Sequence, residues 1–175
     1  MSELQPEGIN VKVKGEAHSF LFSLRLIEII QYKTGKRTGK TVGNIMNPES
    51  GALRFVLTEL LNDEQFRNGG ERRYSETDAG EMILSCDLED LAQLIIAITR
   101  AYDVSMPDPD EDTEEKSTEE LLDIPKFIML GMVKMHYTEE ELLKMTPRKF
   151  FLMFDKYLEI QGLKKEEVAP IDLLP

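Results

Sequence analysis

Hydrophobic and polar positions alternate near the start of the chain and recur at helical spacing after it. Ile9, Val11 and Val13 alternate with polar residues, and a Gly-Glu pair separates them from a second extended stretch through Phe20 and Phe22. This period of two predicts a short β-hairpin with one buried face. It is the only strong strand signal in the sequence, so we expect a mainly α-helical fold that begins with this hairpin.

Two helices are predicted next from their periodicity and their end signals. An apolar stripe predicts a helix from Leu24 to Lys33, with Gly35 as its left-handed C-terminal stop. The Asn47-Pro48 pair combines a capping side chain with a first-turn proline, and it predicts a second helix from about Pro48 to Leu61.

Two further helices follow before residue 105. Ser75 and Asp78 have the spacing of a capping box and predict a short third helix. Asp87 caps a fourth helix whose apolar stripe is too broad for a small domain to cover easily, so we expect residues 1–105 to self-associate. The stripe consists of Leu88, Leu91, Leu94, Ile95, Ile98 and Tyr102.

A strongly acidic stretch lies between Pro107 and Glu120. It contains eight acidic residues and one lysine, so its own charge (1 - 8 = -7) is over half of the net charge of -12. Such a stretch repels itself and has little apolar surface to bury, so we expect a flexible linker at residues 106–120.

The region after the linker contains three helix starts. Ile124-Pro125 opens an apolar helix, a second capping box precedes a short helix, and Thr146-Pro147 opens the last helix. The predicted fold is therefore mainly α, with a β-hairpin and a four-helix module in residues 1–105, the acidic linker, and a small three-helix module in residues 121–175. So short a bundle is marginally stable alone.

The charge balance and the chain start limit the cellular setting. A net charge of -12 repels nucleic-acid backbones and anionic lipids, so we expect neither as a partner. The single cysteine, Cys86, cannot form an internal disulfide, and the first residues lack the basic and apolar regions of a secretory signal. We expect a cytoplasmic protein with no membrane contact.

Two sequence motifs have the wrong form for the ligands they suggest. Residues 35–41 have a glycine spacing one residue short of a phosphate-binding loop and no buried strand before them, so we expect a mobile basic loop. Asp108, Asp110, Asp112 and Glu119 have the spacing of calcium ligands, but Thr113 replaces the required turn glycine.

No combination of residues indicates catalysis. His18 and His136 lie on separate segments with no nucleophile motif near either, and paired carboxylates arise by composition in a chain with thirty-three acids. We expect no enzyme activity, no cofactor and no metal site.

Methionines and misplaced cations are the candidate binding features. Five of the nine methionines lie beyond the linker, and such adaptable side chains suit varied partner surfaces, although gap-filling in a small core is the alternative. We therefore take Met129, Met132 and Met135 as candidate partner-binding residues. Arg148 and Lys149 are added because they lie in the first turn of the last helix, where the helix dipole disfavours cations.

The run YTEEELLKMTPRKFF at residues 137–151 resembles the C-terminal extension of tail assembly chaperones from long-tailed bacteriophages. In that family an acidic short helix precedes a cap of this Met-Thr-Pro-Arg-Lys-Phe type. The first hundred residues are similar to the short chaperone of the same system, with a hairpin, a helix that ends near Thr34-Gly35, an Asn-Pro helix start and a Leu-rich helix opened by Asp87-Leu88. The resemblance identifies the chain as the extended form, or as a fused equivalent, from a phage or prophage.

The resemblance implies a role in virion morphogenesis in the cytoplasm of the bacterial host. Such chaperones coat the tape-measure protein and bring tail-tube subunits to it, so the implied partners are these two proteins and further copies of the chain. An acidic adaptor that covers the basic surface of a host protein through residues 107–120 is the alternative. A nucleotide-dependent enzyme is a third class, which rests only on the imperfect loop at residues 35–41.

Overall fold

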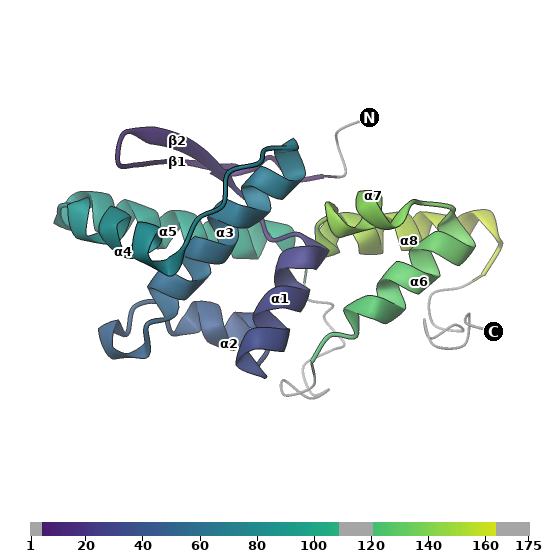
Figure 1. The fold of residues 1–175 in the computed structure, drawn as a ribbon. Helices are drawn as coiled ribbons and strands as arrows, with labels where there is room; N and C mark the ends of the chain where they lie inside the picture. Colours follow the sequence, from purple (N-terminus) through teal and green to yellow (C-terminus); the bar gives the residue numbers. More distant parts are fainter. Residues whose placement is uncertain (1–4, 109–120, 164–175) are drawn as a thin grey trace.

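The computed structural model describes residues 5–108 and 121–163 of the chain. Within these ranges a two-stranded antiparallel sheet is followed by helices (Figure 1), which confirms the predicted fold class. The elements are β1 (Ile9–Val13), β2 (Glu16–Phe20), α1 (Leu24–Thr34), α2 (Thr38–Gly43), the 3-10 helix η1 (Pro48–Ser50), α3 (Ala52–Asn68), α4 (Glu76–Ser85), α5 (Leu88–Ser105), α6 (Ile124–Met135), α7 (Glu139–Leu143) and α8 (Pro147–Ile160).

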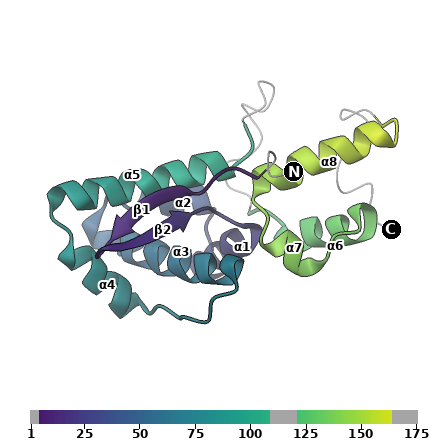
Figure 2. The same ribbon diagram turned by 90° about the horizontal axis from the view of Figure 1, so that it is seen from above.

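The hairpin forms where the alternating pattern predicts it. Ile9 pairs with Phe20, and the two turn residues, Lys14 and Gly15, both have positive φ, as a tight two-residue hairpin turn requires. The hairpin lies over α5 and α3 (Figure 2) and buries Val13 and Phe20 there. This packing gives the sheet the covered face that an isolated hairpin lacks.

The basic segment after α1 contains a helix, which corrects the expectation of a mobile loop. Thr38, Thr41 and Val42 of α2 are buried, and α2 contacts α1, α3 and α5. Gly39 lies so close to Tyr102 of α5 that a Cβ at this glycine would meet the tyrosine Oη at 2.8 Å. Tertiary packing therefore stabilises α2, although its two glycines disfavour a helix locally.

The second predicted helix begins and ends later than expected. The Asn47 side chain accepts a backbone N–H as predicted, but it caps only the single turn of η1. Gly51 then adopts a left-handed conformation with φ of 65°, which interrupts the helix. As a result α3 starts after this glycine and continues past the predicted end at Leu61.

The other predicted helix starts are confirmed by their cap geometry. Each capping side chain accepts a hydrogen bond from the first turn of its helix, which satisfies an otherwise unpaired backbone N–H. These caps are the boxes of Ser75 with Asp78 and of Thr138 with Glu141, together with Asp87 before α5 and Thr146 before Pro147 of α8.

The buried apolar side chains form one cluster that includes residues from both ends of the chain. Helices α6 and α7 contact α1, and α8 contacts α5. The predicted division into residues 1–105, 106–120 and 121–175 stays a prediction, because residues 109–120 of the expected linker lie outside the described residues. The contacts nevertheless show that α6, α7 and α8 pack on the N-terminal helices.

Candidate partner-binding surfaces

The first candidate surface is an apolar stripe on α6. Met129 and Met132 are 53% and 43% exposed, and the neighbouring Val133 is 47% exposed. Their spacing of three and four residues places them on one face of the helix. Met135 is half-buried and packs against the core, so the structure brings together two of the three candidate methionines but not the third.

Arg148 is bound within the chain rather than extended into solvent. Its Nε donates a hydrogen bond to the carbonyl of Val104 at 2.9 Å, and its two Nη atoms donate to the carboxylate of Asp108 at 3.0 and 2.8 Å. The carbonyl of Val104 belongs to the last turn of α5, where the helix dipole is negative. The position of this cation in α8 therefore has a structural cause, which is the adjacent end of α5.

Lys149 has a different setting from its neighbour. It is half-buried, its backbone N–H donates to the Thr146 hydroxyl at 3.2 Å, and its charge helps to lower the pKa of Glu141, after the stronger effects of the hydrogen bonds from Thr138. Of the two candidate cations, Lys149 is thus the one with no described contact to α5.

The C-terminal helices are attached to α1 through backbone atoms. The Gln31 side-chain amide donates to the carbonyl of Leu122 and accepts from its N–H, both at 2.9 Å. The N–H of Leu24 donates to the carbonyl of Met145 at 2.8 Å. The sequence analysis missed Gln31, because a glutamine in a helix carries no local sign of a partner 91 residues away.

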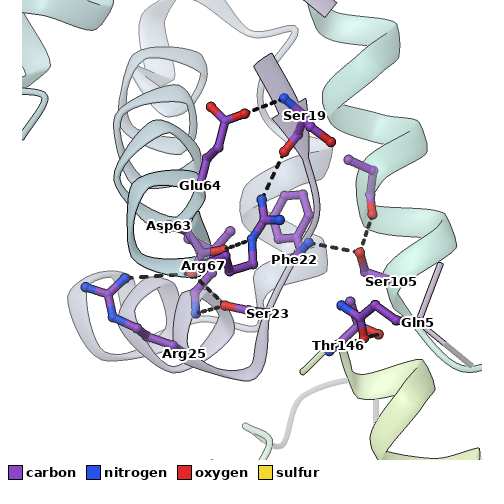
Figure 3. A network of polar contacts seen from close by, with 12 residues as sticks. Gln5, Ser19, Phe22, Ser23, Arg25, Asp63, Glu64, Arg67, Ser105 and Thr146 are labelled. Atoms are coloured by element: carbon purple, nitrogen blue, oxygen red, sulfur yellow. Dashed lines mark hydrogen bonds and ion pairs between the residues drawn. The ribbon is translucent and has the colours of Figure 1, made fainter. Parts of the chain in front are cut away.

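A buried polar network joins the start of α1 to α3 (Figure 3). The carboxylate of Asp63, which is fully buried, accepts from the Ser23 hydroxyl at 2.6 Å and from Arg67 Nε at 2.9 Å, and Arg25 lies 3.7 Å away. Burial raises the pKa of Asp63, whereas Arg67, Ser23 and Arg25 all favour its charged form. The same hydroxyl of Ser23 caps α1, so the network fixes where this helix begins.

A second part of the network attaches the hairpin to α3. The Glu64 carboxylate lies 2.7 Å from Nδ1 of His18 and accepts the N–H of Ser19, while Arg67 donates to the Ser19 carbonyl at 2.9 Å. Burial acts to raise the pKa of Glu64, but the contacts from His18, Ser19 and Arg67 outweigh it and the pKa is lowered. Together these contacts join the hairpin, the start of α1 and α3, so the network stabilises the fold.

The second candidate surface is an apolar groove between η1, α4 and α5, with a volume of about 530 Å³. Leu84, which is 87% exposed, lines it together with Met46, which is 75% exposed. The groove also contains Leu91 and Ile95 from the broad stripe predicted for α5, whereas Leu94 of that stripe is buried. The sequence analysis missed the contribution of α4, although three successive apolar residues at positions 82–84 cannot all face one core.

Ligand-binding motifs remain without support in the described residues. No group of three or more His, Cys, Asp or Glu side chains in these ranges is placed to hold a metal ion, and most of the calcium-like spacing at residues 108–119 lies outside them. Burial, followed by the nearby acids, raises the pKa of the half-buried Cys86 thiol, which disfavours the reactive thiolate.

None of the described helices has the length and apolar character needed to cross a membrane.

Comparisons of the chain with protein-family models, with curated proteins and with solved structures give no match.

Proposed function

We propose that this protein is a tail assembly chaperone of a long-tailed bacteriophage or prophage, which acts in the cytoplasm of the bacterial host. In this proposal it coats the tape-measure protein, recruits tail-tube subunits and catalyses no reaction. The observation that carries the proposal is the sequence at residues 137–151, which is similar to the C-terminal extension of that family. This segment forms the capped helix α7, the connecting turn and the start of α8.

The distribution of exposed apolar side chains supports a protein with two binding surfaces. The groove between η1, α4 and α5 belongs to the N-terminal helices, whereas the stripe on α6 belongs to the C-terminal ones, and Figure 1 shows these elements at opposite ends of the molecule. A chaperone that holds one protein while it recruits another needs two such separate surfaces, because tethering raises the effective concentration of the recruited partner. We assign tail-tube recruitment to the α6 stripe and to Lys149.

A pull-down with tail-tube protein tests the recruiting surface. We expect Met129→Glu with Met132→Glu to abolish recovery of the tail-tube protein, since charges on the stripe oppose apolar contact. Lys149→Glu is expected to weaken recovery. The matched control is Ile160→Glu, because Ile160 is an 81% exposed apolar residue of α8 that lies outside the stripe.

The result that would refute the proposal is a wild-type chain that binds neither tail-tube protein nor tape-measure protein. The acidic adaptor is distinguished by a second variant, in which the acids of residues 107–120 become Ser and Gly at constant length. The chaperone proposal expects tail assembly to persist in this variant, whereas an adaptor that acts through these acids would lose its function.

A further inference from the structure

The two outer edges of the hairpin have different neighbours. The hairpin closes on a two-residue turn, so Val13 and Glu16 form a hydrogen-bonded pair and the following pairs alternate with it. Asn10 and Lys12 of β1 therefore direct their backbone N–H and carbonyl groups away from β2, and Ser19 of β2 directs its own away from β1. Figure 2 shows β2 on the side of α3 and β1 on the side of α5.

The edge of β2 is closed at Ser19 by α3, whereas the edge of β1 is open. Glu64 accepts the N–H of Ser19, and Arg67 donates to the Ser19 carbonyl (Figure 3). The outward N–H and carbonyl groups of Asn10 and Lys12 receive no such bond from any residue that the structure describes. A strand edge with unpaired backbone groups is a template for a further strand, so β1 is placed to accept one.

A groove with a volume of about 290 Å³ lies beside this open edge, and we call it the edge groove. Asn10 and Lys12 are exposed, and Ile96 of α5 has 48% of its surface exposed. Solvent therefore reaches the outer edge of β1, and the groove offers an apolar side chain next to it. The lining consists of residues 9–12 of β1 together with Asp90, Gln93, Ile96, Ala97 and Arg100 of α5.

We propose that the edge groove binds an extended segment of another protein, which adds to β1 as a third, antiparallel strand. The backbone of this segment pairs with the outward groups of Asn10 and Lys12, as in other cases of peptide recognition by strand addition. Antiparallel pairing is favoured because it is slightly more stable per residue than parallel pairing. Alternate side chains of the added strand face α5, where an apolar one contacts Ile96.

The charged residues of α5 determine which segment fits. Asp90 and Arg100 of the groove lining are about 15 Å apart along the helix. β1 and α5 run in opposite directions (Figure 2), so Asp90 lies towards the hairpin turn and Arg100 towards the start of β1. A lysine and a glutamate four residues later are about 13 Å apart on one face of a strand, which matches this spacing.

Arg100 is available to a carboxylate of the added strand. None of the described residues forms an ion pair or a hydrogen bond with its guanidinium. Glu89 and Asp103 are further acids of α5, but neither lines the edge groove. The preferred segment therefore has a lysine near Asp90, an apolar residue near Ile96 and a glutamate near Arg100, in that order along an antiparallel strand.

This inference goes beyond the proposed function. It concerns a surface separate from the α6 stripe and from the groove between η1, α4 and α5, and it requires no association between copies of the chain. Lysine on an edge strand opposes unselective pairing with other strands, so Lys12 leaves the selection of the segment to the side chains of the groove.

Titration of a synthetic heptapeptide into the isotope-labelled full chain, followed by NMR, tests the inference. The probe is Thr-Lys-Thr-Val-Thr-Glu-Thr with blocked ends, and the control peptide has its Lys and Glu exchanged. We expect the probe to shift the amide signals of residues 9–13 and to protect the amides of Asn10 and Lys12 from hydrogen exchange. The control peptide should bind at least about fivefold more weakly, because each of its charges would face a like charge.

Two variants test the backbone and the charge separately. Lys12→Pro removes an outward N–H, and Lys12→Gln is its matched control, since both lose the lysine charge. Proline is tolerated at an edge position whose N–H is not part of the ladder, so both variants should keep the hairpin. We expect Lys12→Pro to bind the probe at least about fivefold more weakly than Lys12→Gln. Arg100→Gln, at an exposed site, should fold like wild type and reduce the preference for the probe over the control peptide.

Several results would overturn the inference. They are unshifted β1 signals at about 1 mM probe, equal binding of the probe by Lys12→Pro and Lys12→Gln, and a wild-type preference that Arg100→Gln leaves unchanged. Protection of the Asn10 and Lys12 amides before any peptide is added would also overturn it, because the chain itself or a second copy would then cover the edge. These measurements contain no tail protein, so they can fail while the pull-down with tail-tube protein succeeds, and the reverse.

Discussion

Replacing Arg148 by methionine should loosen the attachment of α8 to α5. The substitution keeps most of the apolar stem and removes the guanidinium, which donates to the Val104 carbonyl at 2.9 Å and to Asp108 at 3.0 and 2.8 Å. Lys149→Met is the matched control, since it removes a cation from the adjacent position of the same helix turn. The helix dipole alone would predict that both changes stabilise α8 slightly.

The magnitude follows from the exposure of the two acceptors. Asp108 is 83% exposed at its side chain, so its ion pair with Arg148 contributes at most about 1 kcal/mol. The hydrogen bond to Val104 is half-buried and comes from a charged donor at the negative end of α5, which is worth about 1.5 kcal/mol. We expect Arg148→Met to lower the free energy of unfolding by about 2 kcal/mol, and Lys149→Met to change it by less than about 0.5 kcal/mol.

Urea unfolding of the full chain, followed by far-UV circular dichroism, measures both values. Asp108→Asn should lower stability by less than about 1 kcal/mol, because the Val104 contact persists in that variant. Equal effects of Arg148→Met and Lys149→Met, or a more stable Arg148→Met protein, would refute the conclusion that the end of α5 accounts for this cation.

Three further predictions concern other contacts. Gln31→Met should lower the free energy of unfolding by about 1–3 kcal/mol in urea, because it leaves the N–H and carbonyl of Leu122 without their partner. Gly131→Ala should cost about 1–3 kcal/mol in thermal unfolding, since the added Cβ would lie 2.5 Å from a methyl carbon of Leu142. Glu64→Gln should reduce the loss of unfolding free energy at acidic pH. The pKa of Glu64 is lowered in the folded state, so its charged form contributes stability that is present above about pH 4.3 and is lost as the pH falls through the folded pKa.

Each of these changes has a control on the same chain. Tyr32→Met, next to Gln31 but 89% exposed, should leave stability unchanged. Gly43→Ala should be neutral or stabilising, because nothing lies within 4 Å of the added Cβ. Should Glu64→Gln reproduce the wild-type dependence of stability on pH, the contacts of Glu64 with the hairpin would not be a source of acid sensitivity.

Local signals predicted most helix starts correctly because capping acts over three or four residues. Ser75, Thr138 and Thr146 each accept a hydrogen bond from the turn that follows them, so their sequence neighbours carry the information. The same local reasoning failed at Gly51. It weighed the cap at Asn47 but not the left-handed glycine that separates η1 from α3.

The remaining features depend on contacts between distant residues. Helix α2 exists because Thr38 and Val42 are buried against other helices, which outweighs its poor intrinsic propensity. Among the candidate binding residues, Met129 and Met132 lie exposed on one face of α6, as their spacing indicates. The position of Arg148 in the first turn of α8 did not indicate its hydrogen bond to α5, because that bond depends on how the two helices pack. The groove required knowledge of how α4 and α5 pack, which the pattern of either helix does not contain.

The bond between Gln31 and Leu122 has a consequence for synthesis on the ribosome. The two residues are 91 positions apart, and translation at about 5–20 residues per second separates their appearance by roughly 5–20 s. During that interval the face of α1 that later receives the C-terminal helices, including Leu24, has no native cover from them. A nascent chain with an exposed apolar helix face is a substrate for the general folding factors of the cell, so we expect this protein to depend on them until its C-terminal helices have been synthesised.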